Sequence, residues 1–251
     1  MKDRLRQAEV FHFKQFDLHH GQSSMPVGTD ATLLGAWADI PGDVPGEGSV
    51  ADIGCGCGIL ALMAAQRFPH ARVTGIDIDE SSVREACRNA QECPFADRVD
   101  FLCEDIREYA RVQGQQSFML VLSNPPYFTE DPLPPDARRS LARNSVHLCF
   151  AELLAAVKRM LHRDGAFAVV LPMQARDGFV GEALLCGLHL RRECRVRTVM
   201  RKPPKRVLLQ FMVQGGELTL EPDLVLMDDS GRRSTRYAAL CADFYIDGGT
   251  R

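Results

Sequence analysis

The sequence lacks any apolar run approaching the roughly 20 residues that a membrane-spanning helix requires. Its first residues, MKDRLRQAEVF, lack the apolar segment of a secretory signal. No two of its nine cysteines are spaced as C-x-x-C, so we expect reduced thiols rather than a disulfide framework or a zinc site. Internal repeats and low-complexity tracts are absent as well. These absences predict a cytoplasmic protein with no bound metal, no membrane contact and no obligate protein partner.

What the sequence does contain is typical of a globular domain: 251 residues, of which 45% are hydrophobic and 25% charged. The net charge is −3, which argues against a uniformly basic nucleic-acid coat. The charge is unevenly distributed, however. Residues 191–206 carry eight bases and one acid, so the rest of the chain carries −10. Such a basic run is either a solvated face or a surface for an anionic partner.

From about residue 48, short apolar runs alternate with amphipathic segments, the pattern of an α/β fold. We expect strands at 49–53, 71–78, 99–103, 118–123, 166–171, 188–196 and 207–213, helices at 59–68, 81–93, 147–161 and 178–186, and a sharp turn at 163–165. This order predicts a doubly wound, Rossmann-like sheet of seven mostly parallel strands with an antiparallel last strand. One domain is expected, formed by an N-terminal extension (1–47), the core sheet (48–215) and a C-terminal strand and helix (216–251).

A glycine-rich turn, D-x-G-x-G-x-G, joins the first expected strand of this sheet to its helix. Asp52 ends the strand, and Gly54, Gly56 and Gly58 follow it. Glycines there let a ligand approach the backbone closely. A dinucleotide-binding turn has the different spacing G-x-G-x-x-G. Because Asp52 repels an anion and attracts a cation, the turn favours the sulfonium S-adenosylmethionine over NAD as the cofactor.

Two further acids end the next two expected strands. Asp77, followed by Ile78, is expected to accept hydrogen bonds from both ribose hydroxyls. Asp105 is expected to accept the adenine amino group, with Ile106 against the ring. Either acid alone has an alternative role as the N-cap of the following helix. Together with the glycines, they predict a nucleotide site.

The fourth expected strand ends at a possible reaction motif, Asn124-Pro125-Pro126-Tyr127. The two prolines stiffen the loop and leave carbonyls that only accept hydrogen bonds. The Asn124 side-chain oxygen and the Pro125 carbonyl are suited to hold both hydrogens of a planar amino group, with Tyr127 as a stacking surface. This arrangement predicts methyl transfer to an amino nitrogen, driven mainly by positioning.

These motifs resemble those of class I S-adenosylmethionine-dependent methyltransferases of the N-P-P-Y kind. The segments Phe13-Lys14-Gln15-Phe16 and 25–37, together with Arg206-Val207-Leu208-Leu209 and Phe244-Tyr245, narrow the resemblance to bacterial enzymes that modify valine tRNA. The resemblance implies transfer of a methyl group to N6 of the adenine at position 37, just 3′ of the anticodon.

The N-terminal extension is expected to cover the cofactor site. A helix beginning near Thr29 would close over the methionine end of the cofactor, with Lys14, Gln15 and Thr29 close to it. The alternative is a helix that only packs, with Trp37 filling the core.

The basic run is expected to bind RNA phosphates, since Lys and Arg contacts to phosphate provide affinity with little sequence choice. The target base must leave its stack, which costs least in an unpaired loop such as the tRNA anticodon loop. The expected phosphate contacts lie in the basic run and in the long, proline-rich loop after Tyr127: Arg197, Arg201, Lys202, Lys205, Arg206, Arg138, Arg139 and Arg143.

Other functions are compatible with the same motifs. N-P-P-Y also occurs in enzymes that methylate glutamine side chains of release factors, but those carry a sizeable helical N-terminal domain. Amino-N methyltransferases acting on rRNA or DNA are closer alternatives, and a DNA enzyme would need an added recognition domain. A cofactor-binding RNA module without catalysis would have no need of Asn124.

Overall fold

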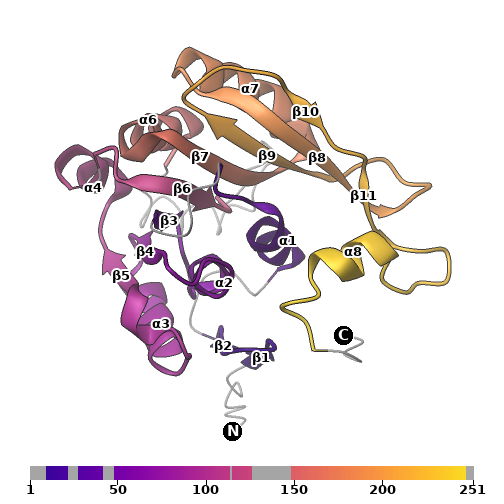
Figure 1. Ribbon diagram of the computed structural model, residues 1–251, viewed down its shortest axis with the longest axis horizontal. Coiled ribbons are helices and arrows are strands. Elements are labelled where there is room, and N and C mark those ends of the chain that lie inside the picture. The colour runs from indigo at the N-terminus through magenta and orange to yellow at the C-terminus, as the bar shows by residue number, and fades with distance from the viewer. Residues whose placement is uncertain (1–9, 22–27, 42–47, 114, 126–147, 247–251) are drawn as a thin grey trace, which may run out of the picture.

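The computed structural model describes residues 10–21, 28–41, 48–113, 115–125 and 148–246 (Figure 1). Its centre is a mostly parallel sheet in the order β10-β8-β9-β7-β6-β3-β4-β5, with β11 also paired to β8. The strands are β3 (Ser49–Ile53), β4 (Arg72–Asp77), β5 (Val99–Cys103), β6 (Phe118–Ser123), β7 (Leu161–Pro172), β8 (His189–Val199), β9 (Arg206–Met212), β10 (Thr219–Leu220) and β11 (Leu224–Met227). β9 is antiparallel to both of its neighbours, which confirms the predicted fold class.

Helices cover both faces of the sheet (Figure 1). One face packs against α1 (Thr29–Trp37), α2 (Ile59–Arg67) and α3 (Glu80–Gln91), and the other against α4 (Ile106–Val112), α6 (Phe150–Met160) and α7 (Arg176–Leu185). Strand residues alternate between the two cores: Val50 faces the first core and Ala51 the second. This period of two is what a sheet buried on both faces requires.

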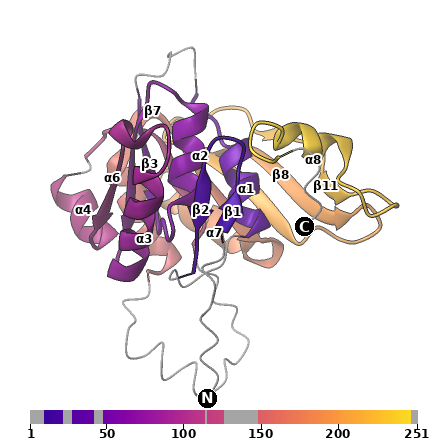
Figure 2. The same cartoon turned by 90° about the horizontal axis from the view of Figure 1, so that it is seen from below.

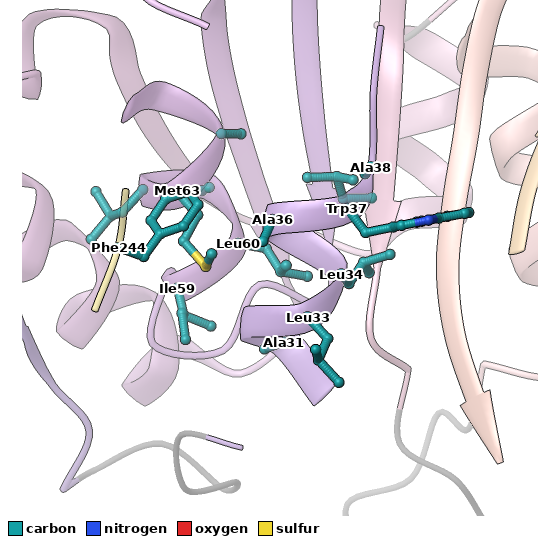
Figure 3. Close-up of a cluster of buried hydrophobic side chains, with 14 of the residues drawn as sticks. Ala31, Leu33, Leu34, Ala36, Trp37, Ala38, Ile59, Leu60, Met63 and Phe244 are labelled. Atoms are coloured by element: carbon teal, nitrogen blue, oxygen red, sulfur yellow. The ribbon is translucent and has the colours of Figure 1, made fainter. Parts of the chain in front are cut away.

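The first and last described segments lie on the first face. A hairpin of β1 (Val10–His12) and β2 (Asp17–His19) lies against α3 (Figure 2), and α8 (Thr235–Leu240) follows β11. Phe244 packs into the α1–α2 core near Met63 (Figure 3). Two short 3-10 helices, Ala96–Arg98 and Met173–Ala175, complete the described elements.

Three details differ from the sequence-based prediction. The sheet has nine described strands, because the C-terminal segment, for which one strand was predicted, adds two strands, β10 and β11, to the predicted seven. The predicted turn at 163–165 lies inside β7, where a register shift accommodates it: Phe118 pairs with Leu161, but Leu120 pairs with Ala166. The helix expected from residue 147 begins at Phe150.

Candidate active site

The predicted site residues follow strands whose carboxyl ends meet at one edge of the sheet. Ile53 in β3 pairs with Ile76 in β4 and with Ser123 in β6. The Ser123 hydroxyl donates a buried hydrogen bond of 2.9 Å to the Ile53 carbonyl oxygen. The parallel topology therefore brings Asn124 next to the start of the glycine turn, although 70 residues separate the two in the chain.

The glycine turn has a conformation that favours glycine. Gly54, Gly56 and Gly58 have φ values of +70°, +53° and +87°, all in the left-handed region. An added Cβ on Gly54 or Gly56 would meet no atom within 4 Å, so the turn borders open space there. A Cβ on Gly58 would lie 2.7 Å from Cζ of Phe101, a β5 residue that the sequence reasoning did not single out.

Asp52 is a buried carboxylate beneath this turn, only 1% exposed. Its Oδ2 accepts a hydrogen bond of 3.1 Å from the Ala61 amide in α2, whereas its Oδ1 is buried without a partner among the described residues. Burial, reinforced by the nearby charge of Asp77, raises the pKa of Asp52 to about 7. A cationic ligand would stabilise the ionised form of this carboxyl.

Asp77 lies on the open side of the same turn. Its Oδ2 accepts a hydrogen bond of 2.8 Å from the Gly56 amide, and its Oδ1 accepts one of 2.9 Å from the Asp79 amide. The N-cap of α3 is Asp79, not Asp77, because the Asp79 side chain accepts from the Ser82 amide. Asp77 therefore shapes the turn, and its lone pairs allow further acceptance. The neighbouring Ile78 is 55% exposed, an apolar surface at the rim of the site.

Asp105 has the capping role that the sequence left open. It is the N-cap of α4, accepting from the Arg107 amide at 2.9 Å, and it also pairs with the Arg107 guanidinium. Its hydrogen bonds with that guanidinium hold the pKa of Asp105 below its usual value. Ile106 is buried in the second core. These contacts establish the capping role, and the adenine contacts predicted for Asp105 and Ile106 stay a prediction.

Asn89, in α3, is a residue that the sequence reasoning missed. It is fully buried, and its Nδ2 donates to the Cys57 carbonyl at 2.9 Å and to the His19 carbonyl at 2.8 Å. Its Oδ1 accepts from the His19 amide at 2.9 Å. One side chain thus fastens the glycine turn to the N-terminal hairpin. No local sequence signal marks it, since a lone asparagine in a helix has no fixed role.

His19 joins the hairpin to the glycine turn through Asn89, whereas the residues predicted to approach the cofactor were Lys14 and Gln15. The latter two lie in the β1–β2 turn, where the Lys14 amide donates to the Phe244 carbonyl. The adjacent Phe16 packs edge-on against Phe95, ahead of β5 and towards the amino end of the sheet. These contacts describe the backbone of the β1–β2 turn, and the cofactor contacts predicted for Lys14 and Gln15 stay a prediction.

Thr29 does lie at the carboxyl edge. It is the first residue of α1, and the adjacent Asp30 pairs with Arg206 at 2.7 Å. Arg206 is opposite Pro172 at the carboxyl end of β7. This ion pair fixes the start of α1 at the same edge as the glycine turn.

Part of the predicted site lies outside the described residues. Asn124 is half-buried and Pro125 is buried. Predictions for Pro126, Tyr127, Arg138, Arg139 and Arg143 fall in the segment 126–147, which the structure does not describe.

Neither a metal site nor a membrane span was found in the described residues. No group of three or more His, Cys, Asp or Glu side chains there is arranged to hold a metal ion. Their helices are too short or too polar to cross a bilayer.

Comparison with known proteins finds methyltransferases both by a family model and among curated relatives. Residues 50–148 match the family model of a methyltransferase domain. The chain is 36% identical over 237 residues to a tRNA1(Val) (adenine(37)-N6)-methyltransferase of Phocaeicola vulgatus, covering 94% of this chain and 97% of that one. A protein of the same name from Vibrio campbellii is 34% identical, with 98% and 99% covered.

Solved structures show the same fold. A predicted O-methyltransferase from Agrobacterium tumefaciens superimposes with a TM-score of 0.64 at 19% identity, covering 86% of this chain and 96% of that one. A geranyl diphosphate methyltransferase in complex with sinefungin gives a TM-score of 0.52 at 16% identity, with 73% and 77% covered.

Proposed function

This chain belongs to the tRNA1(Val) (adenine(37)-N6)-methyltransferase family, and on that premise we propose that it transfers a methyl group from S-adenosylmethionine to N6 of adenine 37 in valine tRNA. The observation that carries the proposal is the shared sheet edge. Asn124 follows β6, and the Ser123 hydroxyl ties the end of β6 to the strand that leads into the glycine turn. The glycine turn, which would hold the cofactor, and the amide side chain of Asn124 thus belong to one proposed site.

The residues of the turn fit S-adenosylmethionine. Gly54 and Gly56 leave open space where a Cβ would otherwise stand, and Asp52 Oδ1 is a buried acceptor without a described partner. We propose that Asp52 stabilises the positive charge of the cofactor, that Asp77 accepts its ribose hydroxyls and that Ile78 contacts its adenine. Thr29 belongs to this set by its position at the edge.

Asn124 and Pro125 are proposed to hold the amino group of the target adenine. That nitrogen is a poor nucleophile because its lone pair is delocalised into the ring. Acceptance of both hydrogens, by the Asn124 side-chain oxygen and the Pro125 carbonyl, favours a pyramidal nitrogen with its lone pair available. When bound beside Asp52 and Asp77, the cofactor would supply an electrophilic sulfonium methyl, with its sulfur left as a neutral thioether and the proton of the methylated nitrogen released to water.

The substrate must present its adenine unstacked. Flipping a base out costs a few kcal/mol in a duplex and less in an unpaired loop, which agrees with an anticodon-loop target. Pro126 and Tyr127 complete the proposed motif, Tyr127 as the stacking surface. A tRNA substrate also implies that the protein acts in the cytoplasm.

The test is transfer of labelled methyl from S-adenosylmethionine to separate pools of tRNA, rRNA, DNA and release factor. We expect N6-methyladenosine in valine tRNA. Asn124→Ala should lower kcat by on the order of 10²–10³ while cofactor affinity stays unchanged, since one polar transition-state contact is lost. Label on glutamine, or full activity of Asn124→Ala, would contradict the proposal.

A further inference from the structure

The β8–β9 hairpin ends in an exposed basic turn, residues 200–205 (Met-Arg-Lys-Pro-Pro-Lys), here named the docking turn. We propose that Arg201, Lys202 and Lys205 in this turn form the surface that binds the RNA phosphates, and that the other arginines of the basic run support the fold instead. This inference rests on the proposed function and deepens it, because it separates the contacting residues from the supporting ones.

Most arginines of the basic run are already paired within the protein. Arg192 pairs with Glu221 at 2.9 Å and Arg195 with Glu193 at 3.0 Å. The Arg191 guanidinium donates to the backbone carbonyls of residues 214, 215 and 217. Each of these guanidinium groups already has part of its charge and hydrogen-bonding capacity satisfied within the protein, so it offers less to a phosphate than an unpaired cation does.

Arg197 and Arg206 support the docking turn itself. Arg197 pairs with Asp223 and also donates to the Lys202 carbonyl at 2.8 Å. Arg206 pairs with Asp30 and donates to the Lys205 carbonyl at 3.3 Å. Although the sequence assigned both arginines to RNA, their contacts hold the turn from its two ends.

Further backbone bonds fix the shape of the turn. The Lys202 amide donates to the Val199 carbonyl at 3.1 Å, and the Lys205 amide donates to the Val196 carbonyl at 2.9 Å. Pro203 and Pro204 lie between these two lysines, and the proline ring fixes the φ angle of each. A surface that is already ordered loses less entropy on binding than a flexible one does.

By contrast, Arg201, Lys202 and Lys205 are exposed, and none of the three side chains forms an ion pair with a described residue. The adjacent Met200 is 67% exposed, so nothing in the described chain covers the tip. The neighbouring loop 228–233 adds no net charge, because Asp228 and Asp229 offset Arg232 and Arg233. The docking turn therefore presents three positive charges to solvent.

The position of the turn matches an RNA whose target base enters at Asn124. The register of the sheet aligns four residues on adjacent strands: Ser123 in β6, Val169 in β7, Leu209 in β9 and Glu193 in β8. β8 is parallel to β7 and continues from Glu193 to Val199. Because a strand rises about 3.3 Å per residue, these six residues place the docking turn roughly 20 Å further along the strand direction than Ser123. The three cations thus flank the edge that holds the active site, at a distance suited to phosphates several nucleotides from the target.

The test is the salt dependence of RNA binding by a triple variant, Arg201→Ala with Lys202→Ala and Lys205→Ala. Each lost phosphate contact lowers the slope of log affinity against log salt by about 0.7–0.9. We expect the slope to fall by about two to three units. Between 50 and 200 mM salt, the affinity loss should therefore be about 30-fold smaller than for the native protein. The effect should be the same for valine tRNA and for an unrelated RNA of equal length.

The matched control is Arg72→Ala with Arg159→Ala and Arg163→Ala, three exposed cations near the amino edge of the sheet. It changes the net charge equally and should keep the native slope. A second variant, Arg201→Lys with Lys202→Arg and Lys205→Arg, should also keep it. An unchanged slope in the alanine triple variant, or an equal decrease in the control, would overturn the proposal.

Methyl transfer measured on the same samples separates the two hypotheses. If the native protein binds RNA but transfers no methyl to tRNA adenine, the proposed function fails and the docking turn is judged by its slope alone. If tRNA is methylated but the alanine triple variant keeps the native slope and KM for tRNA, the docking turn fails and the function stands. We expect a higher KM with kcat largely unchanged.

Discussion

At the scale of single residues, Asp52 is a buried carboxyl group whose Oδ1 has no hydrogen-bond partner among the described residues. Its pKa of about 7 in the folded protein lies above the 3.8 of an ordinary aspartate. The folded state therefore holds a proton that the unfolded state has already released between these two pH values. Asp52 favours folding most below pH 3.8, and this contribution is lost as pH rises towards 7.

A cationic cofactor should reverse that preference, because it stabilises the carboxylate. We predict that affinity for S-adenosylmethionine rises with pH, by up to about tenfold per unit below pH 7, and levels off above it. Titration calorimetry at several pH values measures this, with proton release read from buffers of different ionisation enthalpy. Asp52→Asn should bind weakly with no such dependence, and a native affinity independent of pH would contradict the role.

The three acids show what sequence can establish about single residues. Asp52, Asp77 and Asp105 look equivalent, since each ends an expected strand before a helix. Which acid caps a helix depends on where that helix begins. An N-cap directly precedes its helix. α3 begins two residues too late for Asp77 to cap it, whereas α4 begins directly after Asp105. Helix boundaries are the part of a sequence prediction that depends most on tertiary packing.

At the scale of elements, the glycine turn is formed by three segments together. Phe101 of β5 lies beneath both Gly58 and Gly75, and a Cβ on Gly75 would clash with Cδ1 and Cε1 of its ring. Gly75 belongs to β4, between the turn and Phe101. Because Gly75 has no side chain, the Phe101 ring can pack across it and contact the glycine turn.

We predict that Gly75→Ala destabilises the protein by about 1–3 kcal/mol through overpacking. Adding Phe101→Leu should recover part of this loss, which a double-mutant cycle of urea unfolding would measure. Gly54→Ala is the contrasting variant: its Cβ meets no atom, so it should cost only about 1–2 kcal/mol of backbone strain yet abolish cofactor binding. Additive effects of Gly75→Ala and Phe101→Leu would show that the two do not meet.

The core strands β3, β5 and β6 have the predicted limits, because turn or helix signals bound each of them closely. The longest strands, β7 and β8, extend beyond the predicted ranges 166–171 and 188–196. The unpredicted strands β1, β2 and β10 have two or three residues each and few buried side chains, so they carry no hydrophobic period. They form because a partner segment offers backbone hydrogen bonds, which no local pattern reveals.

At the scale of the whole molecule, the first and last described segments contact each other. Phe13 pairs with Tyr245 across an isolated bridge, and the first core contains residues from Phe13 to Phe244. The hairpin continues through His19 and Asn89 to the glycine turn. We propose on this basis that residues 1–251 form one domain in which the N-terminal extension covers the cofactor site.

Phe244→Ala should therefore destabilise the whole protein, by about 3–5 kcal/mol, since this side chain is 2% exposed. Ile246→Ala, two residues further on and 49% exposed, is the control and should cost little. Urea unfolding followed by far-UV circular dichroism and by Trp37 fluorescence should give one coincident transition. Two separate transitions would indicate that the terminal segments form an independent unit.

The sequence by itself determined the α/β fold, the cofactor turn, the acceptor motif and the basic run, because each is written in local spacing and composition. Only the tertiary structure decided which of these residues meet. Ion pairs occupy most of the arginines between 191 and 206, Asn89 joins three segments, and Asp105 caps a helix. The physical reason is that neighbours which already pair with a charge or an amide reduce what that group can offer to a ligand. Those neighbours come from distant parts of the chain.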